Sequence, residues 1–146
     1  MVMARVLVIE DEDPLRRIIM MNLVRRGHSV TEAESADAAS DAIACAWAVR
    51  QPFDVLLLDL NLPDQPGWDI LRWLDAAAAG VGPARKPHVI IITAVHPAQR
   101  RLEEFRPDAL LIKPFPIDAL LRAVDRVTGL HPIADAEREA LEVSDG

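Results

Sequence analysis

The chain has 146 residues, 51% of them hydrophobic and 27% charged, and its formal net charge is −7. At this length folding buries roughly two-thirds of the surface that the unfolded chain exposes, so we expect one domain whose core needs no disulfide staples. The acidic balance argues against a nucleic-acid-binding face, because binding to phosphates needs clustered Lys and Arg.

Short apolar runs alternate along the chain with segments of helical periodicity. The runs are too short for core helices and are rich in leucine and β-branched residues, as buried parallel strands are. In chain order we predict a strand at 6–9, a helix from 13 to a stop near 27, a less buried edge strand at 29–33, a helix from 35 to about 50, a strand at 55–58, a helix at about 67–79, a strand at 89–92, a short helix at about 97–105, a strand at 110–112 and a helix from 116.

Several residues mark where these helices begin. Asp13 is predicted to cap the first helix, with Pro14 in the first turn, where a missing N–H does no harm. Ser35 is predicted to cap the second helix. Five strands alternating with five helices indicate a parallel sheet covered on both faces. We expect this domain to span residues 1–129, and we interpret the acidic residues 130–146 as a tail or the start of a linker.

Other single residues receive structural interpretations. Cys45 is the single cysteine of the chain, which excludes an intramolecular disulfide and a multi-cysteine zinc site. Its alanine-rich surroundings predict a small core residue. The four histidines show no metal spacing and are predicted to lie at the surface or beside strands. The arginine pairs at 16–17, 25–26 and 100–101 predict solvated helix faces. Because the chain shows neither a signal peptide nor an apolar run of about 18 residues, we expect a cytoplasmic protein that does not enter the membrane.

Polar side chains stand where the predicted strands end. The first strand is followed by Glu10 and Asp11, the third by Asp59, the fourth by Thr93 and the fifth by Lys113. In an open parallel sheet, ligands collect at the carboxyl ends of the strands. Three carboxylates, a hydroxyl and an ammonium group are therefore expected to converge at one edge.

This set of groups predicts phosphoryl chemistry. Clustered carboxylates raise one another's pKa unless a cation joins them, and Mg²⁺ prefers such oxygen ligands. Lys113 supplies a point charge for a phosphate oxygen. A metal ion, an ammonium group and a hydroxyl together suit a phosphoryl group in transfer, and a carboxylate among them can act as the nucleophile.

The sequence resembles the receiver domains of two-component response regulators over about residues 4–129. The matching stretches are 6–12 (VLVIEDE), 54–63 (DVLLLDLNLP) with Gly67 four residues on, 91–94 (IITA) and 111–115 (LIKPF). The resemblance implies the flavodoxin-like (βα)5 fold, a doubly wound parallel five-stranded sheet of order 2-1-3-4-5. It also implies a signalling module rather than an enzyme, which accepts a phosphoryl group from a histidine kinase or a His phosphotransfer protein.

The resemblance also implies roles for individual residues. Asp59 would be the phospho-acceptor and, with Asp11, a direct ligand of Mg²⁺. The backbone carbonyl of Asn61 would complete the metal shell, and Glu10 would act through metal-bound water. Thr93 with Ala94 and Lys113 would hold the phosphoryl group. The Lys113–Pro114 bond would be cis, which only an X-Pro bond makes inexpensive.

The sequence departs from the family pattern at four places. Glu10 replaces the commoner Asp, and Pro66 stands before Gly67, where the family often has an Asp. Leu110 occupies the switch position, which is usually aromatic, and Arg106-Pro107 replaces the familiar Ala-Gly turn. The last two affect the face made by the fourth helix, fifth strand and fifth helix, where a downstream protein or a second copy would bind.

Two other functions stay open at this stage. Leu110 favours a receiver-like interaction module whose switching is atypical or independent of phosphorylation. A phosphohydrolase of the haloacid-dehalogenase class also uses a strand-end aspartate, but it needs a second Asp two residues on, where this chain has Asn61.

Overall fold

The computed structural model describes residues 3–81 and 86–129, so the predicted tail at 130–146 lies outside the described residues. Five parallel strands form one sheet in the order β2-β1-β3-β4-β5, as predicted. The elements in chain order are β1 (Arg5–Ile9), α1 (Asp13–Arg25), β2 (Ser29–Ala33), α2 (Ala36–Ala48), β3 (Val55–Asp59), α3 (Gly67–Val81), β4 (His88–Thr93), α4 (Gln99–Phe105), β5 (Ala109–Ile112) and α5 (Ile117–Thr128).

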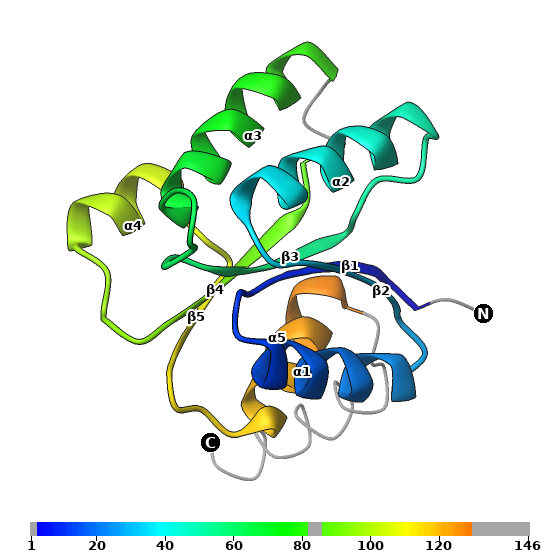
Figure 1. Ribbon diagram of the computed structural model, residues 1–146, viewed down its shortest axis with the longest axis vertical. Coiled ribbons are helices and arrows are strands. Elements are labelled where there is room, and N and C mark those ends of the chain that lie inside the picture. The colour runs from blue at the N-terminus through cyan, green and yellow to red at the C-terminus, as the bar shows by residue number, and fades with distance from the viewer. Residues whose placement is uncertain (1–2, 82–85, 130–146) are drawn as a thin grey trace, which may run out of the picture.

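Helices cover both faces of the sheet (Figure 1). On one side α2, α3 and α4 enclose a core that includes Leu7, Leu56 and Ile91. On the other side α1 and α5 enclose a core that includes Val8, Leu57 and Ile90. Neighbouring residues of one strand therefore enter opposite cores, which explains why the central strands are continuous apolar runs rather than alternating ones.

The strand order determines which strand ends are adjacent, because the chain places β2 on one side of β1 and β3 on the other. β1 pairs with β2 on one side and with β3 on the other. Ile9 lies opposite Leu58, so the residues that follow β1 emerge next to Asp59. Asp59 lies opposite Ile92, and Thr93 lies opposite Ile112. The carboxyl ends of β1, β3, β4 and β5 are thus adjacent, at the switch point where open α/β sheets bind ligands.

The helix boundaries differ from the predicted ones by a few residues. Asp13 is the first residue of α1 rather than its cap, because the capping position falls on Glu12, whose side chain makes no capping hydrogen bond. The Ser35 hydroxyl does accept a hydrogen bond from the Ala38 N–H at the start of α2. The helix α2 ends at Ala48 and α4 begins at Gln99, so both are two residues shorter than predicted.

Two predictions about side-chain burial are wrong. Cys45 lies on the exposed face of α2, because Ile43 and Ala46 take the inward positions of that turn. The Arg16 side chain is only 12% exposed and pairs with Asp13 and Glu32. His28 lies directly before β2, as the strand-flanking prediction allowed, and it is buried: it is 5% exposed and its Nδ1 has no hydrogen-bond partner among the described residues.

None of the helices in the described part of the chain has the length and the apolar character to cross a membrane.

The buried His28 makes stability depend on pH. Burial lowers its pKa below 6.5; the nearby Asp125 opposes the shift and Arg26 adds to it. Below about pH 6.5 the unfolded chain binds a proton there that the folded protein does not, so the free energy of unfolding rises with pH in this range. The contribution of His28 is complete above the unfolded-state pKa and is lost as the pH falls below it.

We therefore expect a His28→Gln variant to be less sensitive to acid than the parent. Urea unfolding at about pH 7 and about pH 5 should show a smaller loss of unfolding free energy for the variant over this interval. Equal losses in the two proteins would contradict the buried, neutral state of His28.

Candidate functional site at the carboxyl edge of the sheet

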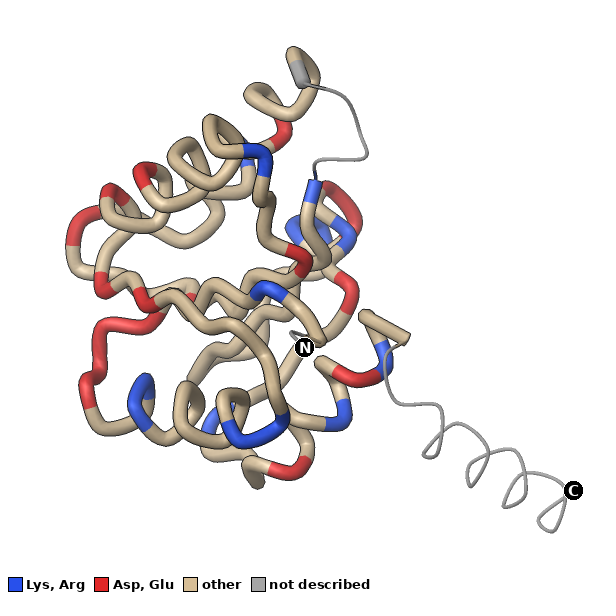
Figure 2. The backbone as a smooth tube through the Cα atoms, turned by 90° about the vertical axis from the view of Figure 1, so that its right-hand side faces the viewer, with Lys and Arg blue, Asp and Glu red and all other residues tan. Residues whose placement is uncertain are grey.

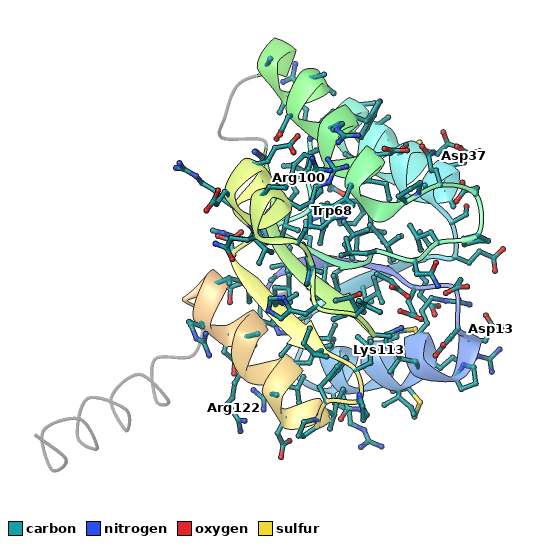
Figure 3. The ribbon with its side chains drawn as sticks, turned by 90° about the vertical axis from the view of Figure 1, so that its left-hand side faces the viewer. Asp13, Asp37, Trp68, Arg100, Lys113 and Arg122 are labelled. Carbon is teal, nitrogen blue, oxygen red and sulfur yellow. The ribbon has the colours of Figure 1, made fainter. Side chains whose placement is uncertain are left out.

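The predicted polar groups meet at the carboxyl edge. Asp59 is the last residue of β3 and Thr93 the last of β4, and the side chains of both are buried. Glu10 and Asp11 follow β1, and Lys113 follows β5. Figure 3 shows Lys113 at this end of the sheet, near the start of α1. Figure 2 shows several acidic segments along one edge of the molecule.

Lys113 joins two of the carboxylates. Its Nζ lies 3.0 Å from Oδ2 of Asp59 and 3.1 Å from both oxygens of Glu10, and it donates hydrogen bonds to all three atoms. Glu10 is fully buried and the Asp59 side chain is 4% exposed, whereas the Lys113 side chain is 17% exposed. A buried carboxylate needs such a partner, because leaving it unpaired in a low-dielectric site is costly.

Protonation at the site reflects this crowding. Burial, together with the hydrogen bond and the charge of Asp59, raises the pKa of Glu10 to about 7, although Lys113 opposes the shift. Burial by itself would lower the pKa of Lys113, but its hydrogen bonds to Asp59 and Glu10 outweigh that effect and raise the pKa. The site therefore holds a firmly protonated ammonium beside more carboxylate charge than it can balance.

The carboxylates also suit a divalent cation. Glu10, Asp11 and Asp59 each offer an oxygen, and these three atoms lie within 4.8 Å of one another. Asp11 is exposed, so it can reach a hydrated ion. Asn61 lies close by, because its N–H donates a 3.0 Å hydrogen bond to Oδ1 of Asp59. A set of hard oxygen donors with access to water fits Mg²⁺.

Two other predicted positions are placed around this cluster. The Thr93 hydroxyl donates to the Val95 carbonyl at 3.1 Å and accepts from the Val95 N–H at 3.3 Å, so it is engaged within its own turn. The adjacent Ala94 is exposed. The Lys113 N–H donates to the Thr93 carbonyl at 2.7 Å, which joins the ends of β4 and β5. The Lys113–Pro114 peptide bond is cis.

The switch position faces the core on the α2–α3 side. Leu110 is half-buried there, against the same core on which an aromatic pair from α3 and α4 also packs. In that pair Trp68 stacks on Phe105 with ring centroids 5.3 Å apart, and Arg72 lies 5.7 Å from the centre of the Phe105 ring. Figure 3 shows Trp68 between α3 and α4. This aromatic pair, rather than an aromatic residue on β5, links α4 to the helix that follows the site.

Two residues at the site escaped the sequence interpretation. The Arg16 guanidinium donates a 2.8 Å hydrogen bond to the Glu10 carbonyl and so braces the turn after β1. The Asp64 carboxylate accepts hydrogen bonds from the N–H groups of Ala36 and Asp37, both at 2.9 Å. An arginine on a helix and an aspartate in a loop carry no local signal for these contacts, since one partner lies across the turn after β1 and the other is 28 residues away in the sequence.

The comparison with known families gives the identity of the chain. Residues 6–125 match the family model described as the response regulator receiver domain. The chain belongs to this receiver family. Family membership makes it a signalling module of two-component systems, and it does not favour the alternative of an interaction module that merely resembles receivers.

Similar proteins agree with this assignment. The receiver is 33% identical over 127 residues to the response regulator protein FleR of Pseudomonas aeruginosa, and the aligned region covers 84% of this chain and 24% of FleR. It is 35% identical over 133 residues to the probable transcriptional regulatory protein TcrX of Mycobacterium tuberculosis, covering 88% of this chain and 52% of TcrX. The chain thus spans about a quarter to a half of these relatives.

A solved structure shows the same fold. The CheY-like receiver domain protein of Methanospirillum hungatei has a TM-score of 0.72 at 21% identity, with 86% of this chain and 94% of that chain covered. The response regulator TrrA of Thermotoga maritima, solved in complex with Mg²⁺ and BeF, has a TM-score of 0.67 at 21% identity, with 85% of this chain and 98% of that chain covered.

Proposed function

We propose that this receiver accepts a phosphoryl group on Asp59, with Mg²⁺, from a histidine kinase or a His phosphotransfer protein. The observation that carries the proposal is the contact of Lys113 with Asp59 and Glu10, which are two of the three clustered carboxylates. In the transfer, an Asp59 carboxylate oxygen forms a bond to phosphorus as the bond from phosphorus to the donor nitrogen breaks. The product is an acyl phosphate on Asp59 and a free histidine on the donor.

The residues around Asp59 have different roles in the transfer. Lys113 already donates a hydrogen bond to the Asp59 carboxylate, and it stays close enough to pair with a phosphoryl oxygen once that carboxylate is phosphorylated. The Asn61 N–H fixes the other Asp59 oxygen and so orients the nucleophile. We assign Thr93 and Ala94 to the opposite side of the phosphoryl group, which requires the Thr93 hydroxyl to leave Val95.

Asp11, Asp59 and the Asn61 carbonyl are the groups that would hold Mg²⁺ directly, with Glu10 acting through water. When bound, the ion offsets the negative charge of the carboxylates and of the incoming phosphoryl oxygens. The new charge of about −2 on Asp59 then favours a conformation in which Thr93 and Lys113 turn toward it. We infer that the face of α4, β5 and α5 reports this change to a downstream protein or to a second copy of the chain.

The receiver domain is proposed to span residues 1–129 and to act in the cytoplasm, where phosphodonors for such modules are found.

Leu110 can take part in transmitting the change at Thr93, although it is not aromatic. Within the described residues it packs against the core that α2 and α3 form, and Phe105 of α4 packs against the same core. A change at Thr93 can therefore reach α4 through packed side chains without an aromatic residue on β5.

A small acyl phosphate tests the proposal without a cognate kinase. In the presence of Mg²⁺, intact-mass spectrometry should show the addition of one phosphoryl group per chain, and chelation of the ion before the reaction should suppress it. Because Mg²⁺ offsets charge that Lys113 alone does not balance, we expect uptake to be at least about 10-fold slower without it. Uptake that is equally fast with a chelator, or no uptake at all, would contradict the proposal.

A further inference from the structure

The loop between β3 and α3 is attached to the start of a different helix. Asp64, in the middle of this loop, accepts hydrogen bonds from the Ala36 N–H through Oδ1 and from the Asp37 N–H through Oδ2, each at 2.9 Å. A third contact runs beside them, from the Gln65 side-chain amide to Oδ1 of Asp37 at 3.5 Å. Figure 3 shows the start of α2, marked by Asp37, beside the loop that leads into α3.

The same loop is part of the phosphorylation site. It begins at Asp59 and carries Asn61, whose N–H holds Oδ1 of Asp59 and whose carbonyl is assigned to the metal. The loop closes on itself through the bridge between Asn61 and Pro66 and through the hydrogen bond from the Gly67 N–H to the Leu60 carbonyl at 2.9 Å. These contacts fix the shape of the loop, and the buried Leu62 anchors it in the core on the α2–α3 side, but none of them attaches the exposed residues Pro63 and Asp64 to a neighbouring element. The contacts of Asp64 and Gln65 with α2 do so.

The helix α2 needs Asp64 less than the loop does. Ser35 already caps this helix in the usual way, by accepting a hydrogen bond from the Ala38 N–H at 3.1 Å. The two backbone donations to Asp64 lower the pKa of its carboxyl group, so it stays ionised at neutral pH and suits the positive end of the helix. Here the acceptor comes from 28 residues further along the chain, from the loop that carries Asn61.

We propose that Asp64 is a positioning residue for the Mg²⁺ site, because it holds the loop of Asp59 and Asn61 against the N-terminus of α2. The inference rests on the proposed function, since it assigns the Asn61 carbonyl to the metal. Asp64 itself does not touch the ion. Its loss leaves the carboxylates in place and lets the Asn61 carbonyl move, so it weakens the affinity for Mg²⁺ more than it weakens the fold.

Isothermal titration of the metal-free protein with Mg²⁺ alone tests this inference. We expect Asp64→Ala to weaken Mg²⁺ binding roughly 10-fold, at the lower end of the effect of changes around a metal shell. Asp64→Asn keeps one carbonyl acceptor and most of the shape, so its affinity should fall between those of the parent and Asp64→Ala. Ser35→Ala is the matched control, because it removes a hydrogen bond from the same helix end without releasing the loop.

A second readout is the amide NMR signal of Asn61, followed with and without Mg²⁺. In Asp64→Ala this signal should shift or broaden before any metal is added, whereas in Ser35→Ala it should keep the position that it has in the parent. Equal Mg²⁺ affinities for the parent and Asp64→Ala, or an equal weakening in Ser35→Ala, would overturn the inference while the proposed function stands. A parent that binds no Mg²⁺ would contradict the proposed function, and this inference with it.

Discussion

Replacing Asp59 with Asn is expected to abolish phosphoryl uptake from a small acyl phosphate in the presence of Mg²⁺. The carboxamide keeps the size of the side chain, and its single oxygen can still accept a hydrogen bond from Asn61 or from Lys113, but it is not a nucleophile toward phosphorus. Intact-mass spectrometry should therefore show the unmodified chain under conditions that fully modify the parent.

The matched control for this variant lies at the other end of the same strand. Asp54 directly precedes β3, and its Oδ2 accepts a 2.8 Å hydrogen bond from the Arg5 N–H. Asp54→Asn removes the same charge from the chain but leaves the carboxyl edge of the sheet untouched, so we expect it to take up one phosphoryl group as the parent does. Uptake by Asp59→Asn at the rate of the parent would place the acceptor elsewhere.

Replacing Gly67 with Ala is expected to destabilise the domain and to disturb the site at the same time. An added Cβ would lie 2.7 Å from the Asp59 carbonyl oxygen and 2.9 Å from the Leu60 Cα, both of them backbone atoms that cannot rotate away. Forcing extra volume into a packed position costs typically about 1–3 kcal/mol. The movement that relieves this overlap displaces the residues next to the phospho-acceptor, so phosphoryl uptake should slow as well.

Gly80 provides the comparison for that substitution, because it lies in the same helix, α3, and a Cβ there would meet nothing within 4 Å. Alanine at an unhindered helical position stabilises a protein by about 0.5–1 kcal/mol relative to glycine. Thermal unfolding should therefore show a lower midpoint for Gly67→Ala and an equal or higher midpoint for Gly80→Ala. A midpoint for Gly67→Ala at or above that of the parent would contradict the close packing of α3 on the end of β3.

The strand pattern and the strand-end residues were sufficient to predict the architecture and the edge at which Glu10, Asp59, Thr93 and Lys113 lie. This succeeds because buried parallel strands are continuous apolar runs, and their carboxyl ends meet at one edge by topology. The individual contacts are another matter. That Lys113 reaches Glu10 as well as Asp59 depends on side-chain positions that no spacing in the sequence specifies.

The failures have a common physical cause. Cys45 and Arg16 were judged from neighbours in the sequence, whereas their exposure depends on elements that pack beside them from elsewhere in the chain. An alanine-rich helix has no strong apolar stripe, so the exposed side of α2 could not be distinguished from its buried side at Cys45. Asp64 resembles any loop aspartate until the fold brings the start of α2 beside it.

The central claim is that Asp59 is the residue that carries the phosphoryl group, and direct mapping of the modified residue tests it. Borohydride reduces an aspartyl phosphate to homoserine, which leaves a permanent mark at the acceptor for fragmentation mass spectrometry. After reaction of the parent with a small acyl phosphate and Mg²⁺, homoserine is predicted at position 59 and at no other aspartate. Homoserine at Asp11, Asp64 or another carboxylate, or a phosphate that survives on a serine, threonine or histidine, would contradict the account.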